Sequence, residues 1–295
     1  MSLPSEPICV MDPSSFELSR QEFGQFARLI TERLGIRMPD IKLTMLQGRL
    51  TRRIRELRLS SFQEYLEYLL RSPNSEQEYV NFVDVVTTNK TDFFREPEHF
   101  EYLVGRALPA LDPDPSFLRP WRAKVWCAGC SSGEEAWTLA MVLGEYAGAR
   151  PGFDFAMLAT DISTRVLARA REAIYPRALI EPVPPALRKN YLLSSRDRSC
   201  NLVRIVPRLR GRVAFRRLNF MDRTYGIEES YAVIFFRNVM IYFDKPTQEA
   251  VLRKLCQHLQ PGGYLFVSHS ESLVGLDVPL RQQATSIFRK AAQSK

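Results

Sequence analysis

The first eighty residues carry apolar positions at helical spacing and no run that favours a strand. Over residues 40–59 these positions recur as one stripe and predict the buried face of a helix, made of Ile41, Met45, Leu46, Leu50, Ile54 and Leu57. Residues 60–72 open with a serine pair and repeat the spacing, which predicts a second helix with a serine cap. We therefore expect residues 1–80 to form a small all-α domain.

Beyond residue 120 the pattern changes to short apolar runs separated by amphipathic segments. Strands are predicted within residues 123–130, 153–163, 213–220, 231–238 and 262–271. Helices are predicted within residues 133–147, 163–174 and 245–259. Alternation of buried strands with helices is typical of a parallel sheet covered on both faces. Residues 121–295 are thus predicted to be an α/β domain.

Two stretches interrupt these patterns. Residues 108–121 are proline-rich and nonperiodic, which indicates a linker within a connecting segment 81–120. Residues 181–211 break the alternation of strand and helix. There, residues 201–206 and 211–218 are predicted to pair as a small antiparallel hairpin, a β insertion near 196–218.

Composition narrows the possible partners. The chain has 41 Lys and Arg against 33 Asp and Glu, a net charge of +8 that favours an acidic partner. No zinc-finger spacing or RNA-binding aromatic strand is present, so we expect no nucleic acid. No apolar run is long enough to span a membrane, and the N-terminus lacks a signal peptide pattern. We expect a cytoplasmic protein without membrane insertion, whose five scattered cysteines are free thiols.

The stretch "CAGCSSGEEAW" carries a cysteine pair, Cys127 and Cys130, with the spacing of a zinc or redox motif. Zinc needs further ligands, but the other cysteines form no second pair and the histidines are few and scattered. A thioredoxin-like pair would open a helix instead of ending a strand. We expect both cysteines to be small wall residues, and we expect no metal.

The same stretch follows the first predicted strand of the sheet, where ligands of α/β folds bind. Gly129 and Gly133 allow a tight turn there. Glu135 follows at the start of the first helix, and Asp161 lies at the tip of the second strand. Acids suit a nucleoside without phosphates whose other groups are cationic, and S-adenosylmethionine has this chemistry. The alternative is that both acids are helix-start and turn residues.

Three further segments, "TTNKTDFFRE" (87–96), "FFRNVMIYFD" (235–244) and "LQPGGYLFVSHSESL" (259–273), resemble the CheR family of chemoreceptor glutamate methyltransferases. The likeness runs from about residue 16 to residue 290. It implies an S-adenosylmethionine-dependent methyltransferase sheet (Rossmann-like) with a helical receptor-recognition domain. The implied activity is protein-glutamate O-methylation in chemotaxis signal transduction, with S-adenosylhomocysteine as product.

The resemblance also implies roles for single residues. Cofactor contacts fall on Asn89, Thr91, Arg95, Glu135, Asp161, Asn219, Phe220, Arg237 and Asn238. The candidate catalytic side chains are Arg95 and Tyr242, for which a structural salt bridge and a buried tyrosine are the alternatives. The chain departs from the family's pattern at Phe236, often cysteine, and at Ser268, often glycine. Neither departure removes a polar cofactor contact.

The implied protein partners are the acidic methylation helices of chemoreceptors. The arginines of the second N-terminal helix are candidates for binding them: Arg49, Arg52, Arg53 and Arg55. A solvated charged face is the alternative. The arginine-rich insertion makes binding of a receptor's tether peptide doubtful. Two rival functions are methylation of another acidic substrate and a non-catalytic adaptor.

Overall fold

The computed structural model describes residues 17–113, 120–197 and 199–291. By its internal contacts the chain divides into two compact units. The first comprises Met1–Glu32 and Arg37–Val86, and the second comprises Arg33–Ile36 and Thr87–Lys295. The segment with the "NKTDFFR" motif therefore belongs to the second unit.

The described residues of the first unit form helices joined by turns and loops, with no strand among them. Its elements are α1 (Arg20–Leu34), the 3-10 turn η1 (Asp40–Lys42), α2 (Leu43–Glu56), α3 (Phe62–Arg71) and α4 (Ser75–Val86). The predicted stripe is confirmed for Leu46, Leu50 and Ile54, which are fully buried. It is wrong for Ile41, which lies in η1 before the helix begins and is 90% exposed. The predicted serine cap of α3 is confirmed, because the Ser61 hydroxyl accepts the Glu64 N–H.

The second unit is built on a seven-stranded sheet in the order β6-β2-β1-β7-β8-β10-β9. The strands are β1 (Trp121–Ala128), β2 (Phe153–Asp161), β6 (Val213–Arg217), β7 (Tyr231–Phe235), β8 (Leu259–Phe266), β9 (Leu280–Ala284) and β10 (Ile287–Lys290). The first five run parallel, and β10 and β9 continue the sheet antiparallel. The predicted α/β architecture is confirmed, although β9 and β10 were not predicted.

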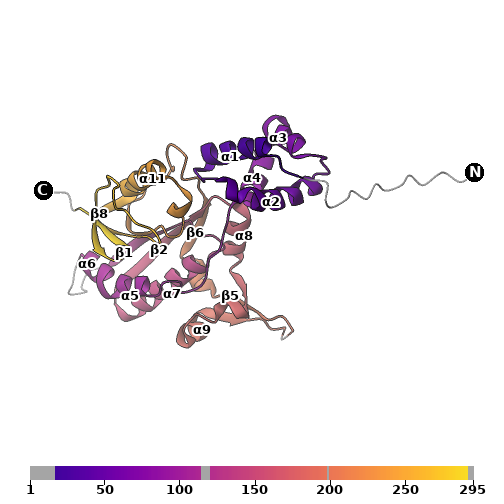
Figure 1. The fold of residues 1–295 in the computed structure, drawn as a ribbon. Coiled ribbons are helices and arrows are strands. Elements are labelled where there is room, and N and C mark those ends of the chain that lie inside the picture. Colours follow the sequence, from indigo (N-terminus) through magenta and orange to yellow (C-terminus); the bar gives the residue numbers. More distant parts are fainter. Residues whose placement is uncertain (1–16, 114–119, 198, 292–295) are drawn as a thin grey trace, which may run out of the picture. The chain divides into compact units, whose positions relative to one another are not determined.

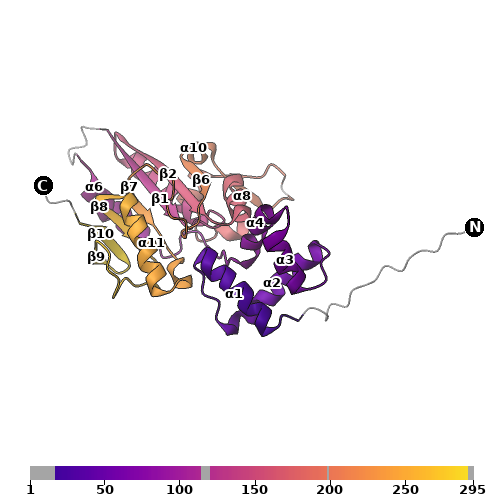
Figure 2. The same ribbon diagram turned by 90° about the horizontal axis from the view of Figure 1, so that it is seen from above.

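Helices cover both faces of this sheet. The helix α11 (Lys245–His258) lies on one side (Figures 1 and 2), and α7 (Glu134–Ala149) lies on the other (Figure 1). The sheet has one hydrophobic core on each face, and successive side chains of β1 alternate between them. Val125 and Cys127 pack in the core with α7, while Trp126 packs in the core with α11. The helix α8 (Thr164–Glu172) follows β2. Strands buried on both faces explain the continuous apolar runs of the sequence.

Residues 98–111, which span part of the predicted linker, form a continuous helical segment. It consists of α5 (Glu98–Tyr102), the π-helical η2 (Leu103–Ala107) and α6 (Leu108–Leu111). Phe100, Leu103 and Leu108 are buried in the same core as α7. The linker prediction was therefore wrong for residues 108–111, and residues 114–119 lie outside the described part of the chain.

The insertion forms a separate three-stranded antiparallel sheet in the order β3-β5-β4, so the predicted β subdomain is confirmed. Its elements are β3 (Ile174–Pro176), η3 (Arg177–Ile180), α9 (Pro185–Tyr191), β4 (Leu192–Ser194), β5 (Leu202–Ile205) and α10 (Pro207–Arg210). The predicted pairing was wrong, because β5 pairs with β3 and β4 while β6 joins β2 in the main sheet. The helix α10 separates the two segments and carries the chain back to the main sheet.

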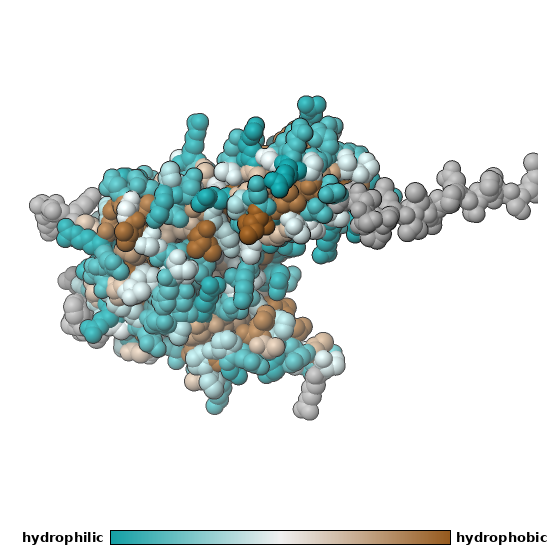
Figure 3. All heavy atoms as spheres, in the orientation of Figure 1, coloured by the Kyte–Doolittle hydropathy of each residue, from teal (hydrophilic) through white to brown (hydrophobic). Residues whose placement is uncertain are grey.

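The visible surface is mostly hydrophilic with scattered apolar patches (Figure 3). Large apolar side chains that are exposed include Ile241 and Val274 of the second unit. None of the helices in the described part of the chain has the length and apolar character that crossing a bilayer requires.

Candidate active site

The predicted site residues gather at the carboxyl edge of the main sheet. The strands β6, β2, β1 and β7 are parallel neighbours, so the segments that follow them emerge on the same edge. These segments begin with Asn219 after β6, Asp161 at the end of β2, Gly129 after β1 and Arg237 after β7. This edge is where open α/β sheets bind ligands.

The turn after β1 is fixed to the end of β2. The N–H groups of Gly129 and Cys130 both donate to the Thr160 carbonyl oxygen, at 2.8 and 2.9 Å. Gly129 has φ 90°, and a Cβ there would lie 2.5 Å from the Val239 Cγ2 atom, so only glycine fits. Ser131 has φ 48° and donates its N–H to the Asp161 Oδ2 atom at 2.8 Å.

Asp161 is oriented by backbone groups on both sides. Its Oδ2 atom accepts from Ser131, and its Oδ1 atom accepts the Ser163 N–H at 3.0 Å. The side chain is 7% exposed. Both oxygens of a carboxylate accept hydrogen bonds, which is the chemistry that the hydroxyls of a ribose require.

Arg237 lies at the centre of a buried ion network. Its Nη1 atom is 2.9 Å from the Glu135 Oε2 atom, and its Nη2 atom is 2.9 Å from the Glu96 Oε2 atom. Nη2 also donates to the Arg95 carbonyl oxygen at 2.6 Å. The Arg237 side chain is inaccessible to solvent, and its Nε atom has no hydrogen-bond partner among the described residues.

The two carboxylates of this network respond differently to burial. Burial raises the pKa of Glu135, and the attraction of Arg237 offsets only part of that rise. Burial also acts to raise the pKa of Glu96, but Arg237 and the Ser268 hydroxyl outweigh it and leave that pKa lowered. The charge of Arg95 also favours the ionised form of Glu135. The guanidinium of Arg237 thus forms ion pairs with both carboxylates.

The segment of residues 87–96 is fastened to the turn after β1. The Ser131 hydroxyl donates to the Asn89 carbonyl oxygen at 2.9 Å, and the Asn89 side chain donates to Thr87. Phe94 and Glu96 have φ of 53° and 55°, a conformation that costs energy in residues other than glycine. Thr91 and Arg95, on this segment, are half-buried.

Two predicted contact residues, Asn219 and Phe220, are already engaged by the protein. The Asn219 amide donates to the Arg33 carbonyl oxygen at 2.8 Å and accepts the Met221 N–H at 3.0 Å. Phe220 is 8% exposed and packs edge-on against Phe236, with ring centroids 5.0 Å apart. Their roles toward a cofactor stay predictions.

The loop after β7 carries the other two predicted residues. Asn238 has φ 61° and donates its side-chain amide to the Ser268 hydroxyl at 2.7 Å. Tyr242 ends the 3-10 turn η4 (Met240–Tyr242) and is half-buried against the core that contains α11.

Comparison with known proteins identifies the family. Residues 21–87 match the CheR methyltransferase all-alpha domain, and residues 89–288 match the CheR methyltransferase SAM binding domain. The chain belongs to the CheR methyltransferase family. Its relatives include chemotaxis protein methyltransferase 2 of Pseudomonas aeruginosa, 36% identical and covering 97% of this chain and 99% of that protein. The chemotaxis protein methyltransferase of Salmonella typhimurium is 36% identical, covering 98% of each, and that of Escherichia coli is 37% identical, covering 88% and 87%.

This CheR-family chain is an S-adenosylmethionine-dependent methyltransferase, and the residues at the sheet edge fit that cofactor. Asp161 offers oxygens for ribose hydroxyls, and Glu135 offers a partly exposed carboxylate for a cationic group. The cofactor, when bound, supplies a methyl group on a positively charged sulfur. No phosphate has to be held, which agrees with the acidic side chains of Asp161 and Glu135 at this edge.

The residues that sequence reasoning missed are Glu96, Ser268 and Glu271. The Ser268 hydroxyl donates to the Glu96 Oε1 atom at 2.8 Å, and Glu271 accepts backbone N–H groups of the loop after β7. Glu96 directly follows Arg95 in the CheR motif, and Glu271 closes "SHSE". Their places in these motifs could have marked them as candidates, but the residues that they bind lie far away in sequence.

The cysteine pair lines the wall of the CheR site, as predicted, and Cys127 adds one polar contact. Cys127 and Cys130 are 0% and 1% exposed, and burial with nearby carboxylates raises both pKa values well above the usual range. The Cys127 thiol lies 3.3 Å from the Glu135 Oε1 atom and donates to it. Both side chains are therefore neutral thiols at physiological pH.

We predict that replacing Cys127 and Cys130 together by alanine leaves methyl transfer measurable, because neither thiol reaches a reactive ionised form. The purified wild-type protein should contain no stoichiometric zinc. Initial rates and elemental analysis check both statements. One zinc per chain, or inactivation by a chelator, would contradict the wall interpretation.

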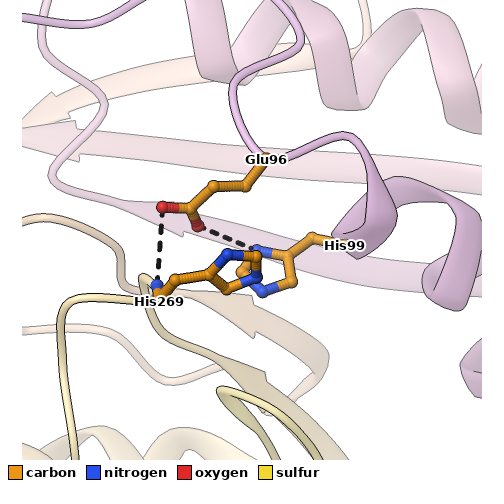
Figure 4. Close-up of side chains that lie close together, drawn as sticks. All are labelled: Glu96, His99 and His269. Carbon is orange, nitrogen blue, oxygen red and sulfur yellow. Dashed lines mark hydrogen bonds and ion pairs between the residues drawn. The ribbon is translucent and has the colours of Figure 1, made fainter.

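Glu96, His99 and His269 form the one group in the described part of the chain whose donor atoms lie close enough to hold a metal, within 4.8 Å of one another (Figure 4). Glu96 is already bound to Arg237 and Ser268, and the His99 Nε2 atom is 2.9 Å from the Ser286 hydroxyl. Burial and Arg237 lower the pKa of His99 to about 4, so it is neutral at pH 7. We interpret the cluster as packing around Glu96, and the absence of a metal stays a prediction.

The arginines of α2 in the helical unit differ in their surroundings. Arg53 is 18% exposed and pairs with the buried Glu78, and Arg49 donates to the Val86 carbonyl oxygen at 2.6 Å. Arg52 is 84% exposed, and Arg55 is also exposed. Of these four arginines, Arg52 and Arg55 are the exposed ones, so any docking role rests mainly on them.

Proposed function

We propose that this protein transfers a methyl group from S-adenosylmethionine to the side-chain carboxylate of specific glutamates in chemoreceptors. The products are glutamate methyl esters and S-adenosylhomocysteine, and the role is sensory adaptation in the cytoplasm. The observation that carries the proposal is the match to both CheR domains, together with relatives named as chemotaxis protein methyltransferases over nearly their full length. The site at the carboxyl edge of the sheet supplies the matching chemistry.

Methylation of a glutamate needs position more than proton transfer. A glutamate side chain is ionised at neutral pH, so its oxygen attacks without a general base. We assign to Arg95 the binding of this carboxylate by a charge-assisted hydrogen bond. Its backbone carbonyl is held by Arg237, which fixes the start of its side chain. Tyr242 is assigned a hydrogen bond to the incoming carboxylate or to the sulfonium region.

We assign the ribose of the cofactor to Asp161, with Glu135 toward the cationic end and Asn89, Thr91, Asn219, Phe220, Arg237 and Asn238 around it. Asp161→Ala should weaken S-adenosylmethionine binding by about 1–3 kcal/mol, because the ribose hydroxyls and the Ser131 N–H lose their acceptor. Calorimetric titration measures this directly. Unchanged affinity would rule out this placement of the nucleoside.

We assign receptor docking to the helical unit, through the exposed arginines of α2. Arg52→Glu combined with Arg55→Glu should lower the initial rate of receptor methylation, because attraction to an acidic receptor helix becomes repulsion. The effect should shrink as salt is added, since exposed charges are screened. Cofactor affinity, measured on the same samples, should stay unchanged. Normal methylation at low salt would exclude this face as the docking surface.

A further inference from the structure

Glu271 is a buried carboxylate that the mechanism above does not use. It lies after β8, is 8% exposed, and faces the loop that follows β7. Its Oε2 atom accepts the N–H groups of Asn238 and Ser268, at 3.1 and 2.8 Å. Its Oε1 atom accepts the Met240 N–H at 2.8 Å. One side chain thus gathers backbone donors from two loops of the active site.

These donors need such a partner. The N–H groups at the start of a 3-10 turn have no partner within the turn, and η4 begins at Met240. Asn238 also holds φ 61°, which the surrounding structure must stabilise in a residue other than glycine. Burial raises the pKa of Glu271, and the backbone N–H groups of Ser268, Asn238, Met240 and Ile241 oppose that rise by favouring the charged form.

Ser268 extends the same arrangement to the ion network of Arg237. Its hydroxyl accepts the Asn238 side-chain amide at 2.7 Å and donates to the Glu96 Oε1 atom at 2.8 Å. Glu96 in turn binds Arg237. The Ser268 hydroxyl therefore links the side chain of Asn238 to that of Glu96.

We propose that Glu271, linked to Glu96 through Ser268, is a positioning residue for methyl transfer. It holds the backbone of residues 238–241, and through it sets where Asn238 and Tyr242 face the cofactor and the acceptor carboxylate. Glu271 itself touches neither reacting group. This inference rests on the proposed function, since the roles of Asn238 and Tyr242 come from it.

The test is Glu271→Gln in the full chain. The amide has nearly the same shape but turns a donor toward at least one backbone N–H, so the loop loses a hydrogen bond and shifts. We expect the Kd for S-adenosylmethionine to rise about 3- to 10-fold with a stoichiometry near one. At saturating cofactor, the rate per cofactor-binding site should fall roughly 10- to 100-fold, the cost of a displacement of about 1 Å.

The matched control is Glu249→Gln, which removes a carboxylate that accepts the Asp277 N–H at 3.0 Å in the same unit. That loop carries no predicted site residue, so both quantities should stay within about twofold of wild type. Irreversible unfolding lowers the stoichiometry, whereas reversible unfolding raises the apparent Kd. The folded fraction without cofactor is therefore measured by circular dichroism, and the Kd and the rate are both corrected for it.

Ser268→Gly is the second variant, and it decides the case if Glu271→Gln does not fold. It keeps the Ser268 N–H bond to Glu271 and removes the hydroxyl that links Asn238 to Glu96. We expect a rate loss of about 3- to 10-fold per binding site, the worth of a hydrogen bond. Rates within twofold of wild type for Glu271→Gln, or for Ser268→Gly where only that variant folds, would overturn the proposal. A wild-type protein that methylates no receptor would instead refute the proposed function.

Discussion

Arg237→Ala is expected to destabilise the catalytic unit by about 3–5 kcal/mol and to abolish methyl transfer. The substitution removes the guanidinium that lies between Glu96 and Glu135 and leaves two largely buried carboxylates facing each other without it. It also frees the Arg95 carbonyl oxygen, so the segment that carries the candidate catalytic arginine loses its anchor. Denaturant unfolding and cofactor titration measure the two effects.

The control for this variant is Arg122→Ala, which removes a guanidinium that is 63% exposed and 3.4 Å from Asp154. Its effect on the free energy of unfolding should be below about 0.5 kcal/mol, as for most surface substitutions. If Arg237→Ala were as stable as this control, the ion network would not hold the site together. Retained activity would contradict the assignment of Arg237 to the cofactor environment.

Arg53→Ala is expected to destabilise the helical unit by about 3–5 kcal/mol. Its Nε and Nη2 atoms lie 2.9 and 2.6 Å from the two oxygens of Glu78, which is 3% exposed and also accepts from Tyr65 and Asn81. Removing the arginine leaves a buried carboxylate without its cation. Hydrogen exchange of amides in α2, α3 and α4, measured in the full chain, reports the loss.

Two features distinguish this result from a general effect of losing an arginine. Arg52→Ala, at the neighbouring position, should change exchange very little, because Arg52 is 84% exposed.

The loss of stability caused by Arg53→Ala should also depend on pH. Burial acts to raise the pKa of Glu78, but the hydrogen bonds from Arg53, Asn81 and Tyr65 outweigh it and leave it lowered. The wild-type pair therefore contributes stability above about pH 4.3, the ordinary glutamate value, and loses it as pH falls through the lowered pKa. An equal deficit at low and neutral pH would contradict this account.

The residues that could be predicted from sequence are those whose surroundings are local. Asp161 ends an apolar run, so its place at a strand end follows from the pattern, and Gly129 marks the turn before a helix. The stripe of Leu46, Leu50 and Ile54 depends only on helical spacing. Ile41 fits the same spacing but precedes the helix, because η1 occupies residues 40–42.

The residues that could not be predicted owe their roles to distant partners. Arg52 and Arg53 are neighbours in one basic stretch. Arg53 has a structural role only because Glu78 of α4 forms an ion pair with it. Glu271 accepts hydrogen bonds from the loop after β7, which is distant from it in sequence. The strand β6 pairs with β2 and not with β5, the strand that precedes it in the chain. Pairings over long sequence separations leave no periodic signal in a single sequence.

Methyl transfer to a receptor fragment tests the central claim most directly. The purified chain would be incubated with tritium-labelled S-adenosylmethionine and a cytoplasmic fragment containing the receptor's methylation helices. We predict label on the fragment that mild base releases as volatile methanol, as a glutamate methyl ester requires, and no label when the acceptor glutamates are replaced by alanine. An unlabelled fragment, or label that resists base, would contradict the account.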